Sequence, residues 1–371
     1  MADALKLQFG PAVVTRLASE IHAVHGGFDV EGFERDALRG FDALELLARG
    51  RHLGAVLHRH LPADYSEAID ILLASLGSNR AHAGGMSSFH YLPHTEYVRQ
   101  FGVSHFADSM RALHVLTQVF TGEFAIRPFL EHQQAATLAQ LHVWVSDPDE
   151  HARRLVSEGT RSRLPWAPRL RAFQRDPTPV LLLLEKLRDD PSLYVRRSVA
   201  NNLNDIGKDH PGLLVETAAR WMAGATSERH WVIRHALRDL VKRGDTAALS
   251  VLGYADAARI DVQSVGITPQ APRIGGSVVI TCRLRNPTSS GQRVMADLRV
   301  HFVKSNGAGA AKVFKLAAID IAAGTTVSLR KTISLAQLTT RRHYPGQHFV
   351  ELQMNGVASP LGTFTLHAAK R

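Results

Sequence analysis

The sequence contains a single cysteine, Cys282, and no long apolar run. One cysteine excludes an internal disulfide and any metal site built from several thiolates. A membrane-spanning helix needs roughly 18 or more apolar residues, whereas the longest clean stretch here runs only from Val180 to Leu184. The opening residues MADALKLQFG lack the basic start and apolar core of a secretory signal. These absences predict a soluble, cytoplasmic protein.

Several motifs that carry well-known chemistry are also absent. The sequence has no P-loop, no Gly-rich dinucleotide fingerprint, no nucleophile elbow and no HExxH. His90 and His94 have the spacing of helical metal ligands, but Pro93 between them would break the helix that this spacing requires. The 20 histidines are therefore interpreted as surface and cap residues, and neither a metal nor a cofactor is expected.

Charges are unevenly distributed along the 371 residues, whose net charge is +10. Residues 1–150 carry 11 Lys and Arg against 18 Asp and Glu, a net charge of −7. The corresponding counts are 18 against 10 in residues 151–243 and 14 against 4 in residues 260–371, giving net charges of +8 and +10. Such basic blocks suit a polyanionic partner, because each Lys or Arg docked on a phosphate releases counterions. A basic surface kept for solubility is the alternative.

Apolar residues alternate along the chain after about residue 258, as expected for strands with one buried face. Turn signals such as Asn286-Pro287 and Asn355-Gly356 separate the alternating runs. About seven short strands in this region are typical of an antiparallel β-sandwich. Residues 343–356 resemble the strand F corner of immunoglobulin-like domains, with Tyr344 as the corner tyrosine. Residues 259–371 are thus predicted to form an immunoglobulin-like β-sandwich.

The first 258 residues have the apolar spacing of paired helices and contain one faint internal repeat. Arg154, Arg197 and Arg234 occupy equivalent places in it, 43 and 37 residues apart, within the segments HARRLVSEG, YVRRSVANNL and WVIRHALRDL. A period near 40 residues with helix pairs is typical of HEAT-like α-solenoids, which stack into a slab with one concave face. Glycines predict helix ends at Gly159 and Gly207.

The stretch from Arg153 to Arg175 contains seven arginines and one carboxylate, Glu158. All four tryptophans lie within residues 144–231. Arginine beside tryptophan on a concave face suits a sugar-phosphate backbone. Trp166 is predicted to lie in a loop because prolines flank it, whereas core positions are the favoured interpretation of Trp144, Trp221 and Trp231.

Two carboxylates lie where helix electrostatics disfavour them. Asp205 falls just before the predicted helix end at Gly207, and Glu158 directly precedes Gly159. An acid near a helix C-terminus opposes the macrodipole at a cost of about 0.3–1 kcal/mol, so both are candidate functional residues. Two structural alternatives remain open: an ion pair of Glu158 with Arg154, and a cap or turn contact of Asp205. A third acid, Glu123 in TGEF, has the appearance of an ordinary helix start.

At these residues the sequence resembles a known family. ARRLVSEGTRSRLPW (residues 152–166) closely resembles the signature of bacterial AlkC-type DNA alkylation-repair glycosylases of the HEAT-like repeat superfamily. The similarity extends through residues 1–258, including TGEFAIRPFLE and YVRRSVANNLNDIGKDHP. A branch of that family carries a C-terminal immunoglobulin-like domain. The resemblance therefore implies an α-solenoid over residues 1–258 followed by the β-sandwich of residues 259–371.

The resemblance also implies an activity and its residues. Such proteins excise N3-alkylated bases, chiefly 3-methyladenine and 3-methylcytosine, from double-stranded DNA in base excision repair, without a metal or a deep base-flipping pocket. The active-site positions of the family fall here on Glu123, Glu158, Asp205 and Trp166, with Arg154 as a phosphate contact. Asp205 and Glu158 are interpreted as the main catalytic pair, supported by Glu123.

Arginines outside the catalytic set are predicted to bind DNA, and two alternative functions remain. The predicted DNA-binding residues are Arg154, Arg161, Arg163, Arg197, and Arg341 and Arg342 in a sandwich loop. We expect a monomer. Two alternatives remain: a HEAT scaffold that binds DNA or protein without cleaving anything, and an enzyme directed at 7-alkylguanine. A pure binder has no reason to place carboxylates in its most arginine-rich stretch, which favours the enzyme.

Overall fold

The computed structural model describes residues 6, 9–77, 85–254, 258–305, 309–338 and 341–369. Contacts within the chain divide it into two compact units. The first, called here the helical unit, comprises residues 1–210 with 226–235, and the second, the sandwich unit, comprises residues 211–225 with 236–371. Among the described residues, no helix combines the length and the apolar character needed to cross a membrane.

The helical unit consists of α-helices joined by short loops and 3-10 turns. Its helices are α2 (Pro11–Val24), α3 (Val30–Leu38), α4 (Leu46–His60), α5 (Tyr65–Ala74), α6 (Leu92–Phe101), α7 (Phe106–Leu116), α8 (Arg127–His132), α9 (Gln134–Trp144), α10 (Glu150–Gly159), α11 (Arg171–Arg175), α12 (Thr178–Leu187), α13 (Leu193–Asp209) and α15 (Ser227–Ala236), with 3-10 turns η1 (Phe41–Ala43) and η3 (Gly85–Tyr91).

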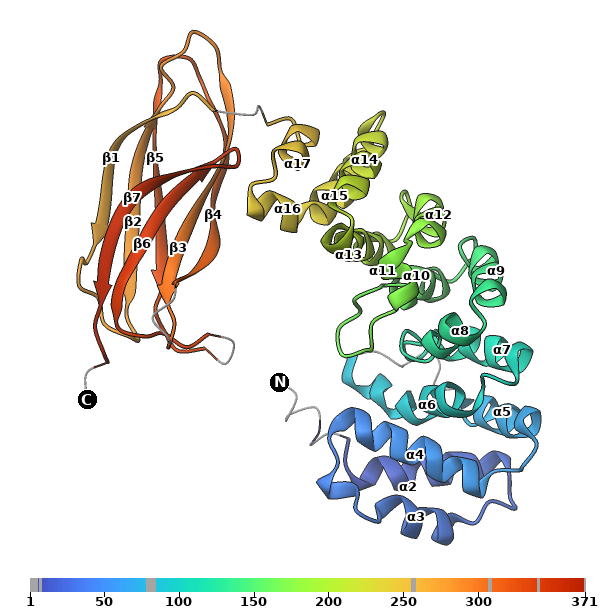
Figure 1. Ribbon diagram of the computed structural model, residues 1–371. Helices are drawn as coiled ribbons and strands as arrows, with labels where there is room; N and C mark the ends of the chain where they lie inside the picture. The colour runs from blue at the N-terminus through green and yellow to red at the C-terminus, as the bar shows by residue number, and fades with distance from the viewer. Residues whose placement is uncertain are drawn as a thin grey trace. The chain divides into compact units, whose positions relative to one another are not determined.

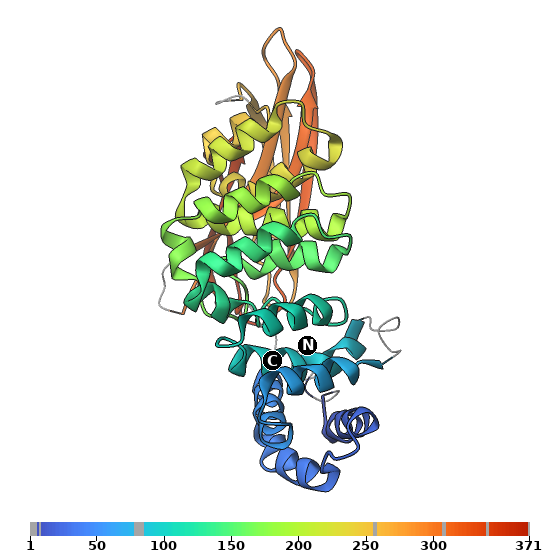
Figure 2. The same cartoon turned by 90° about the vertical axis from the view of Figure 1, so that its right-hand side faces the viewer.

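These helices stack in chain order, as the resemblance to HEAT-like proteins predicts. Figure 1 shows α5, α7, α9 and α12 in one row and α6, α8, α10 and α13 in another, and Figure 2 shows the helices of the green segment lying side by side. Helix α10 packs against α13, α12 and α9. Leu155 and Val156 of α10 and Val199 and Leu203 of α13 are buried, so the two helices that carry the predicted acids share one core.

Side-chain caps fix where these two helices begin. The carboxylate of Asp149 accepts a hydrogen bond from the backbone N–H of His151 at the start of α10, and Ser192 accepts one from Tyr194 at the start of α13. Helix α10 ends at Gly159, as predicted. The predicted end at Gly207 is wrong, because α13 continues to Asp209; Pro211, which disfavours helical geometry in the residue before it, follows His210.

In its described residues, the sandwich unit combines three helices with seven strands. Helices α14 (Pro211–Met222), α16 (Arg238–Arg243) and α17 (Thr246–Val251) precede β1 (Asp261–Thr268), β2 (Ser277–Arg285), β3 (Gln292–Val303), β4 (Gly309–Ile321), β5 (Thr326–Ser334), β6 (Gly346–Met354) and β7 (Val357–Leu366).

The strands form two antiparallel sheets, β1-β2-β5 and β4-β3-β6-β7, which face each other in Figure 1. Every predicted inward residue of β2 is buried, from Val278 to Leu284 in steps of two, and the same face of β3 includes Val294, Leu298 and Val300. These residues form one apolar core between the sheets. The predicted seven-stranded immunoglobulin-like sandwich is therefore confirmed.

Helices α16 and α17 pack on the sandwich through a small apolar cluster of Leu249, Tyr254 and Met295. Beside it two glycine backbones meet. A Cβ atom added to Gly244 would lie 2.8 Å from the carbonyl oxygen of Gly356, and one added to Gly356 would lie 2.5 Å from that of Gly244. Both glycines have positive φ, +79° and +88°, so only glycine permits both the turn and the approach.

Candidate active site

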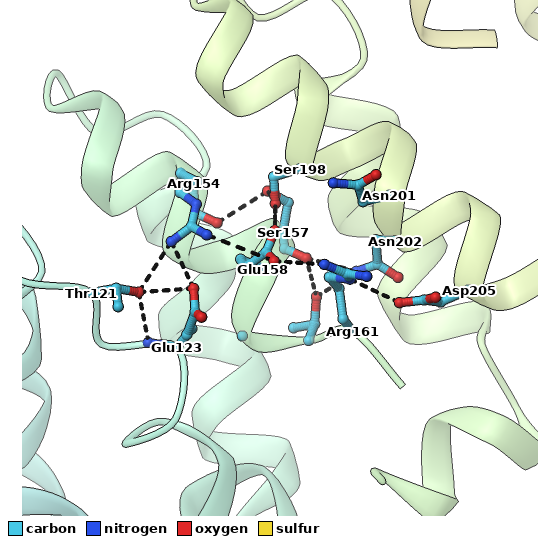
Figure 3. A network of polar contacts seen from close by, with 12 residues as sticks. Thr121, Glu123, Arg154, Ser157, Glu158, Arg161, Ser198, Asn201, Asn202 and Asp205 are labelled. Carbon is cyan, nitrogen blue, oxygen red and sulfur yellow. Dashed lines mark hydrogen bonds and ion pairs between the residues drawn. The ribbon is translucent and has the colours of Figure 1, made fainter. Parts of the chain in front are cut away.

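Glu158 lies at the C-terminal end of α10 with both carboxylate oxygens occupied. The side chain of Ser198, on α13, donates to its Oε2 over 2.6 Å, and Nη1 of Arg161 donates to its Oε1 over 2.7 Å. Arg154 is farther away, with Nη2 at 3.6 Å from the same Oε1. The helical ion pair with Arg154 therefore exists, but the shorter contacts of Glu158 come from outside its own helix or from beyond its end (Figure 3).

Arg154 connects Glu158 to the turn that precedes α8. Its Nη1 lies 2.8 Å from Oε2 of Glu123 and donates to the hydroxyl of Thr121 over 3.0 Å. Burial by itself lowers the pKa of Arg154, but the charges of Glu123 and Glu158 outweigh it, so the pKa is raised. The guanidinium also lies over the ring of Tyr194, 4.9 Å from its centroid. Arg154 is thus a permanent cation between two carboxylates.

The turn that carries Glu123 differs from the helix start suggested by the sequence. Residues 123–126 form a turn, and α8 begins only at Arg127. The hydroxyl of Thr121 donates to Oε2 of Glu123 over 2.9 Å. Glu123 is consequently held by its neighbour and by Arg154, both on the side that faces α10 (Figure 3).

Asp205 is joined to Glu158 through one guanidinium. Nε of Arg161 donates to Oδ2 of Asp205 over 2.8 Å, while Nη1 of the same residue binds Glu158. Lys208 donates to Oδ1 of Asp205 over 2.8 Å. Burial lowers the pKa of Arg161, but the charges of Glu158 and Asp205 more than compensate, and the pKa is raised overall. The Asp205 side chain is 1% exposed, whereas Lys208 is 40% exposed, so the buried acid is paired with a cation that reaches solvent.

A second set of polar contacts fastens α10 to α13 beneath the acids. The hydroxyl of Ser157 donates to that of Ser198 over 2.8 Å. The side-chain amide of Asn202 donates to the carbonyl oxygen of Ser157 over 2.8 Å and to the hydroxyl of Thr160 over 3.0 Å. All four side chains are buried. Buried hydrogen bonds of this kind fix the register of two helices, and here they fix the acids that the helices carry.

Trp166 lies in the loop between α10 and α11, as predicted, and it is 69% exposed. Its φ is +66°, a left-handed conformation that is unfavourable for a large side chain and is often found at functional sites. Arg127 holds the backbone of this loop in place. Its guanidinium donates to the carbonyl oxygens of Gly159, Arg161 and Pro168. Burial lowers the pKa of Arg127 to about 10.

A pocket of about 530 Å³ opens beside these residues. Glu123, Arg154, Glu158, Trp166 and Tyr194 line it, together with an apolar wall that includes Phe89, Phe120 and Phe124. The structure therefore brings three of the four predicted catalytic side chains to one cavity. The fourth, Asp205, lies behind Arg161 and does not line it.

The predicted DNA-binding arginines have different surroundings. Arg154 and Arg161 are engaged by the acids, and Arg163 forms an ion pair with Asp209, in which Nε lies 2.9 Å from Oδ2. Arg197 is exposed on α13.

The two sandwich arginines also differ from each other. The guanidinium of Arg341 packs over Phe302 and Phe314, at 5.1 and 5.9 Å from the ring centroids. Arg342 is exposed. Arg341 is half-buried, so Arg342 is the more exposed of the two.

Several residues of the site could not be predicted from the sequence. Ser198, Tyr194 and Lys208 carry no motif of their own, although all three lie on α13, the helix that supplies Asp205. Arg161 was predicted as a phosphate contact, and the structure instead places it between two carboxylates. Its position three residues after Glu158 is the one signal that points to this pairing.

Among the described residues, no group of three or more His, Cys, Asp or Glu side chains could hold a metal ion. The site is instead built from acids alternating with cations: Glu123, Arg154, Glu158, Arg161, Asp205 and Lys208. Together with the stacked helices and the sandwich, it defines a helical-repeat protein with an acid-lined pocket and an appended immunoglobulin-like domain.

Comparisons with known proteins give the family. Residues 261–368 match the family described as the C-terminal Ig-like domain of the uncharacterised protein YhaZ. The chain is 39% identical over 358 residues to the uncharacterized protein YhaZ of Bacillus subtilis (strain 168), a match covering 96% of this chain and 97% of that protein. It is also similar to the solved structure of Pseudomonas fluorescens alkylpurine DNA glycosylase AlkC bound to DNA containing an abasic site analog, with 38% identity, a TM-score of 0.91 and coverage of 98% of this chain and 99% of that one. The chain belongs to the family of YhaZ and AlkC.

Proposed function

We propose that the protein is a DNA glycosylase that removes alkylated bases from double-stranded DNA in base excision repair. The kinship with AlkC over nearly the whole chain supports the activity. The observation that carries the proposal is the pocket in which Glu123 and Glu158 lie beside Arg154 and Trp166. These are four of the five positions that the family resemblance singles out, and a binding protein for DNA gains nothing from carboxylates there.

We propose cationic N3-alkylated bases as the substrates, chiefly 3-methyladenine and 3-methylcytosine. Such a base already carries a positive charge, so its bond to the sugar is weak without protonation by the enzyme. When the bond between C1′ and the base nitrogen breaks, the electron pair neutralises the base and leaves positive charge on the sugar. Water then adds to C1′ and loses a proton, giving an abasic site and the free base.

The acids of the site suit both halves of this reaction. Carboxylates held in place stabilise the developing positive charge of the sugar without reorganising, which is the most effective form of electrostatic catalysis. One of them also orients the attacking water and takes up its proton. We assign these roles to Glu158, which lines the pocket, and to Asp205, which lies behind it and is joined to it through Arg161. Glu123 supports them by holding Arg154. The exposed ring of Trp166 would present its electron-rich face to the cationic sugar.

DNA binding is assigned to the exposed Arg197 and Arg342 and to Arg163, which is half-buried and paired with Asp209. Arg163 and Arg197 of the helical unit would contact phosphates, and Arg342 would do so from the sandwich unit. We expect the protein to act as a monomer on chromosomal DNA in the cytoplasm. The reaction as written uses only groups of the chain and water, so no metal or cofactor takes part in the proposed steps.

Release of free bases from methylated DNA tests the proposal. The purified protein is incubated with this DNA in the presence of a metal chelator, and the released bases are separated and identified. Release of 3-methyladenine and 3-methylcytosine with little 7-methylguanine is the expected result. Release of 7-methylguanine alone would change the substrate class, and tight salt-sensitive DNA binding without any release would favour a non-catalytic scaffold.

A further inference from the structure

Arg161 touches both acids that are assigned to catalysis. Its Nη1 donates to Oε1 of Glu158 over 2.7 Å and its Nε donates to Oδ2 of Asp205 over 2.8 Å. The two carboxylates come from different helices, α10 and α13. A single rigid guanidinium therefore sets the distance and the relative orientation of the two side chains (Figure 3).

The surroundings of Arg161 disfavour a role as a phosphate contact. Its side chain is 10% exposed, and two of its three guanidinium nitrogens are already engaged by carboxylates. Its backbone is also held, because Nη1 of Arg127 donates to its carbonyl oxygen over 2.8 Å. A side chain fixed at both ends cannot turn toward DNA without giving up its contacts with the two acids.

Electrostatics explains why a cation is needed at this place. Glu158 and Asp205 both lie in the last turn or two of their helices, where the helix dipole opposes negative charge. Two neighbouring carboxylates also repel each other. Arg161 offsets both effects at once, and Lys208 adds a second cation on the far side of Asp205.

We propose that Arg161 is a positioning residue of the reaction, which holds Glu158 and Asp205 in their catalytic arrangement and makes no contact with DNA phosphate. This role rests on the proposed function. It assigns to the buried Arg161 a different task from that of the exposed Arg197 and Arg342.

The test compares Arg161→Gln and Arg161→Lys with Arg153→Gln as the matched control. Arg153 lies on α10, the helix that precedes Arg161, and is 13% exposed. It forms a two-point ion pair with Asp190, with contacts of 2.7 and 3.1 Å, but it touches none of the acids in the site. Single-turnover excision from DNA containing 3-methyladenine is measured with enzyme in excess. Misplacement of reacting groups costs on the order of 10- to 100-fold in rate, so Arg161→Gln should lose this much, Arg161→Lys less, and Arg153→Gln should excise at the wild-type rate.

Binding to a duplex with an abasic-site analogue separates positioning from phosphate contact. The dissociation constant of Arg161→Gln should stay within about twofold of wild type, and the slope of log K against log salt should not change. A phosphate contact would instead reduce that slope by about 0.9. Thermal unfolding of all three variants identifies any that fail to fold, in which case Arg161→Lys carries the comparison.

Each outcome has a definite meaning. A weaker affinity with a reduced salt slope and an intact rate at saturation overturns the positioning role in favour of phosphate binding. A rate for Arg161→Gln equal to that of the Arg153 control also overturns it, and a rate above wild type shows that Arg161 attenuates the acids. A wild-type protein that releases no base refutes the proposed function itself, and the role of Arg161 fails with it.

Discussion

The hydroxyl of Ser198 donates to Oε2 of Glu158 over 2.6 Å, so an α13 side chain holds the acid at the end of α10. Ser157 in turn donates to Ser198 over 2.8 Å. A short chain of two hydroxyls thus ends on the carboxylate that lines the pocket. Glu158 is therefore oriented by one neutral donor, Ser198, and by the cations Arg154 and Arg161. Its position depends on the packing of α10 against α13.

Replacing Ser198 by alanine should reduce excision more than its loss of stability would suggest. The variant removes one hydrogen bond to a charged group, which costs roughly 1.5–3 kcal/mol of folding free energy, and it frees Oε2 of Glu158. We expect the single-turnover rate to fall about tenfold, with DNA affinity unchanged. Ser109→Ala is the control, because Ser109 is also buried and hydrogen-bonded, over 2.8 Å to Tyr65, but lies outside the pocket. Equal rates for the two variants would show that Ser198 acts on stability alone.

Neutral isosteres of the acids should separate catalysis from binding. Glu158→Gln and Asp205→Asn keep the shape of each side chain and remove the charge that would stabilise a cationic sugar. We expect each to lose on the order of 100-fold or more in excision rate while its affinity for an abasic-site duplex is retained. Variants that bind poorly but excise normally at saturating enzyme would contradict the catalytic assignment.

The backbone at Trp166 predicts a difference between two small substitutions. Alanine and glycine both remove the exposed ring, but only glycine relieves the left-handed conformation at φ +66°. A non-glycine residue in this region costs about 1–2 kcal/mol, so Trp166→Gly should be about 1 kcal/mol more stable than Trp166→Ala in urea unfolding. Both should excise more slowly than wild type. Equal stability of the two variants would mean that the loop relaxes when the ring is lost.

The exposed arginine of the sandwich loop should contribute to DNA binding in a salt-dependent way. Arg342→Gln removes one exposed charge, so the slope of log K against log salt should fall by about 0.9 if Arg342 contacts a phosphate. Arg341→Gln should mainly lower stability, since that guanidinium packs on Phe302 and Phe314. Fluorescence anisotropy at several salt concentrations measures the slopes. Identical slopes for Arg342→Gln and wild type would remove the sandwich loop from the DNA interface.

Buried His94 should make the protein less stable in mild acid. Burial, together with the charge of His90, lowers its pKa to about 3, although Glu20 acts in the opposite direction. The unfolded chain takes up a proton near pH 6.5 and the folded chain only near pH 3, so stability is complete above pH 6.5 and is lost as pH falls between these values. At pH 4.5 the loss is roughly 2–3 kcal/mol.

The variant His94→Gln, which cannot titrate, provides the comparison for this prediction. Urea unfolding of wild type and variant at pH 7 and pH 4.5 gives the two free-energy differences. Because every other group titrates in both proteins, the wild type should lose roughly 2–3 kcal/mol more than the variant. An equal loss in both would show that His94 is protonated in the folded state.

Features with a local cause could be predicted from the sequence. The end of α10 at Gly159 follows from one residue, and the inward face of β2 follows from simple alternation. The sequence predicts the end of α13 at Gly207, but the helix continues to Asp209. Gly207 is buried inside the helix, where packing of the surrounding residues offsets its low helix propensity. Pro211, four residues further on, was the better stop signal.

The arrangement of the site was only partly predictable. Helix electrostatics marks Glu158 and Asp205 as candidates but leaves them open to ordinary structural explanations. The catalytic roles of the three acids and Trp166 come from the family resemblance. Arg161 reaches Asp205 across 44 residues, and Ser198 reaches Glu158 across 40 residues. Such contacts depend on the register between α10 and α13, which is set by packing and not by any local pattern.

The two glycines that meet at positions 244 and 356 have a consequence for anyone who divides this protein. Their backbones touch, and Leu249 and Tyr254 pack on Met295. Helices α16 and α17 are therefore part of the folded unit that contains the immunoglobulin-like domain. A cut at residue 258 would expose these apolar side chains to solvent on both fragments. A fusion of this domain to another protein should therefore begin upstream of α16, so that α16 and α17 stay attached to the strands on which they pack.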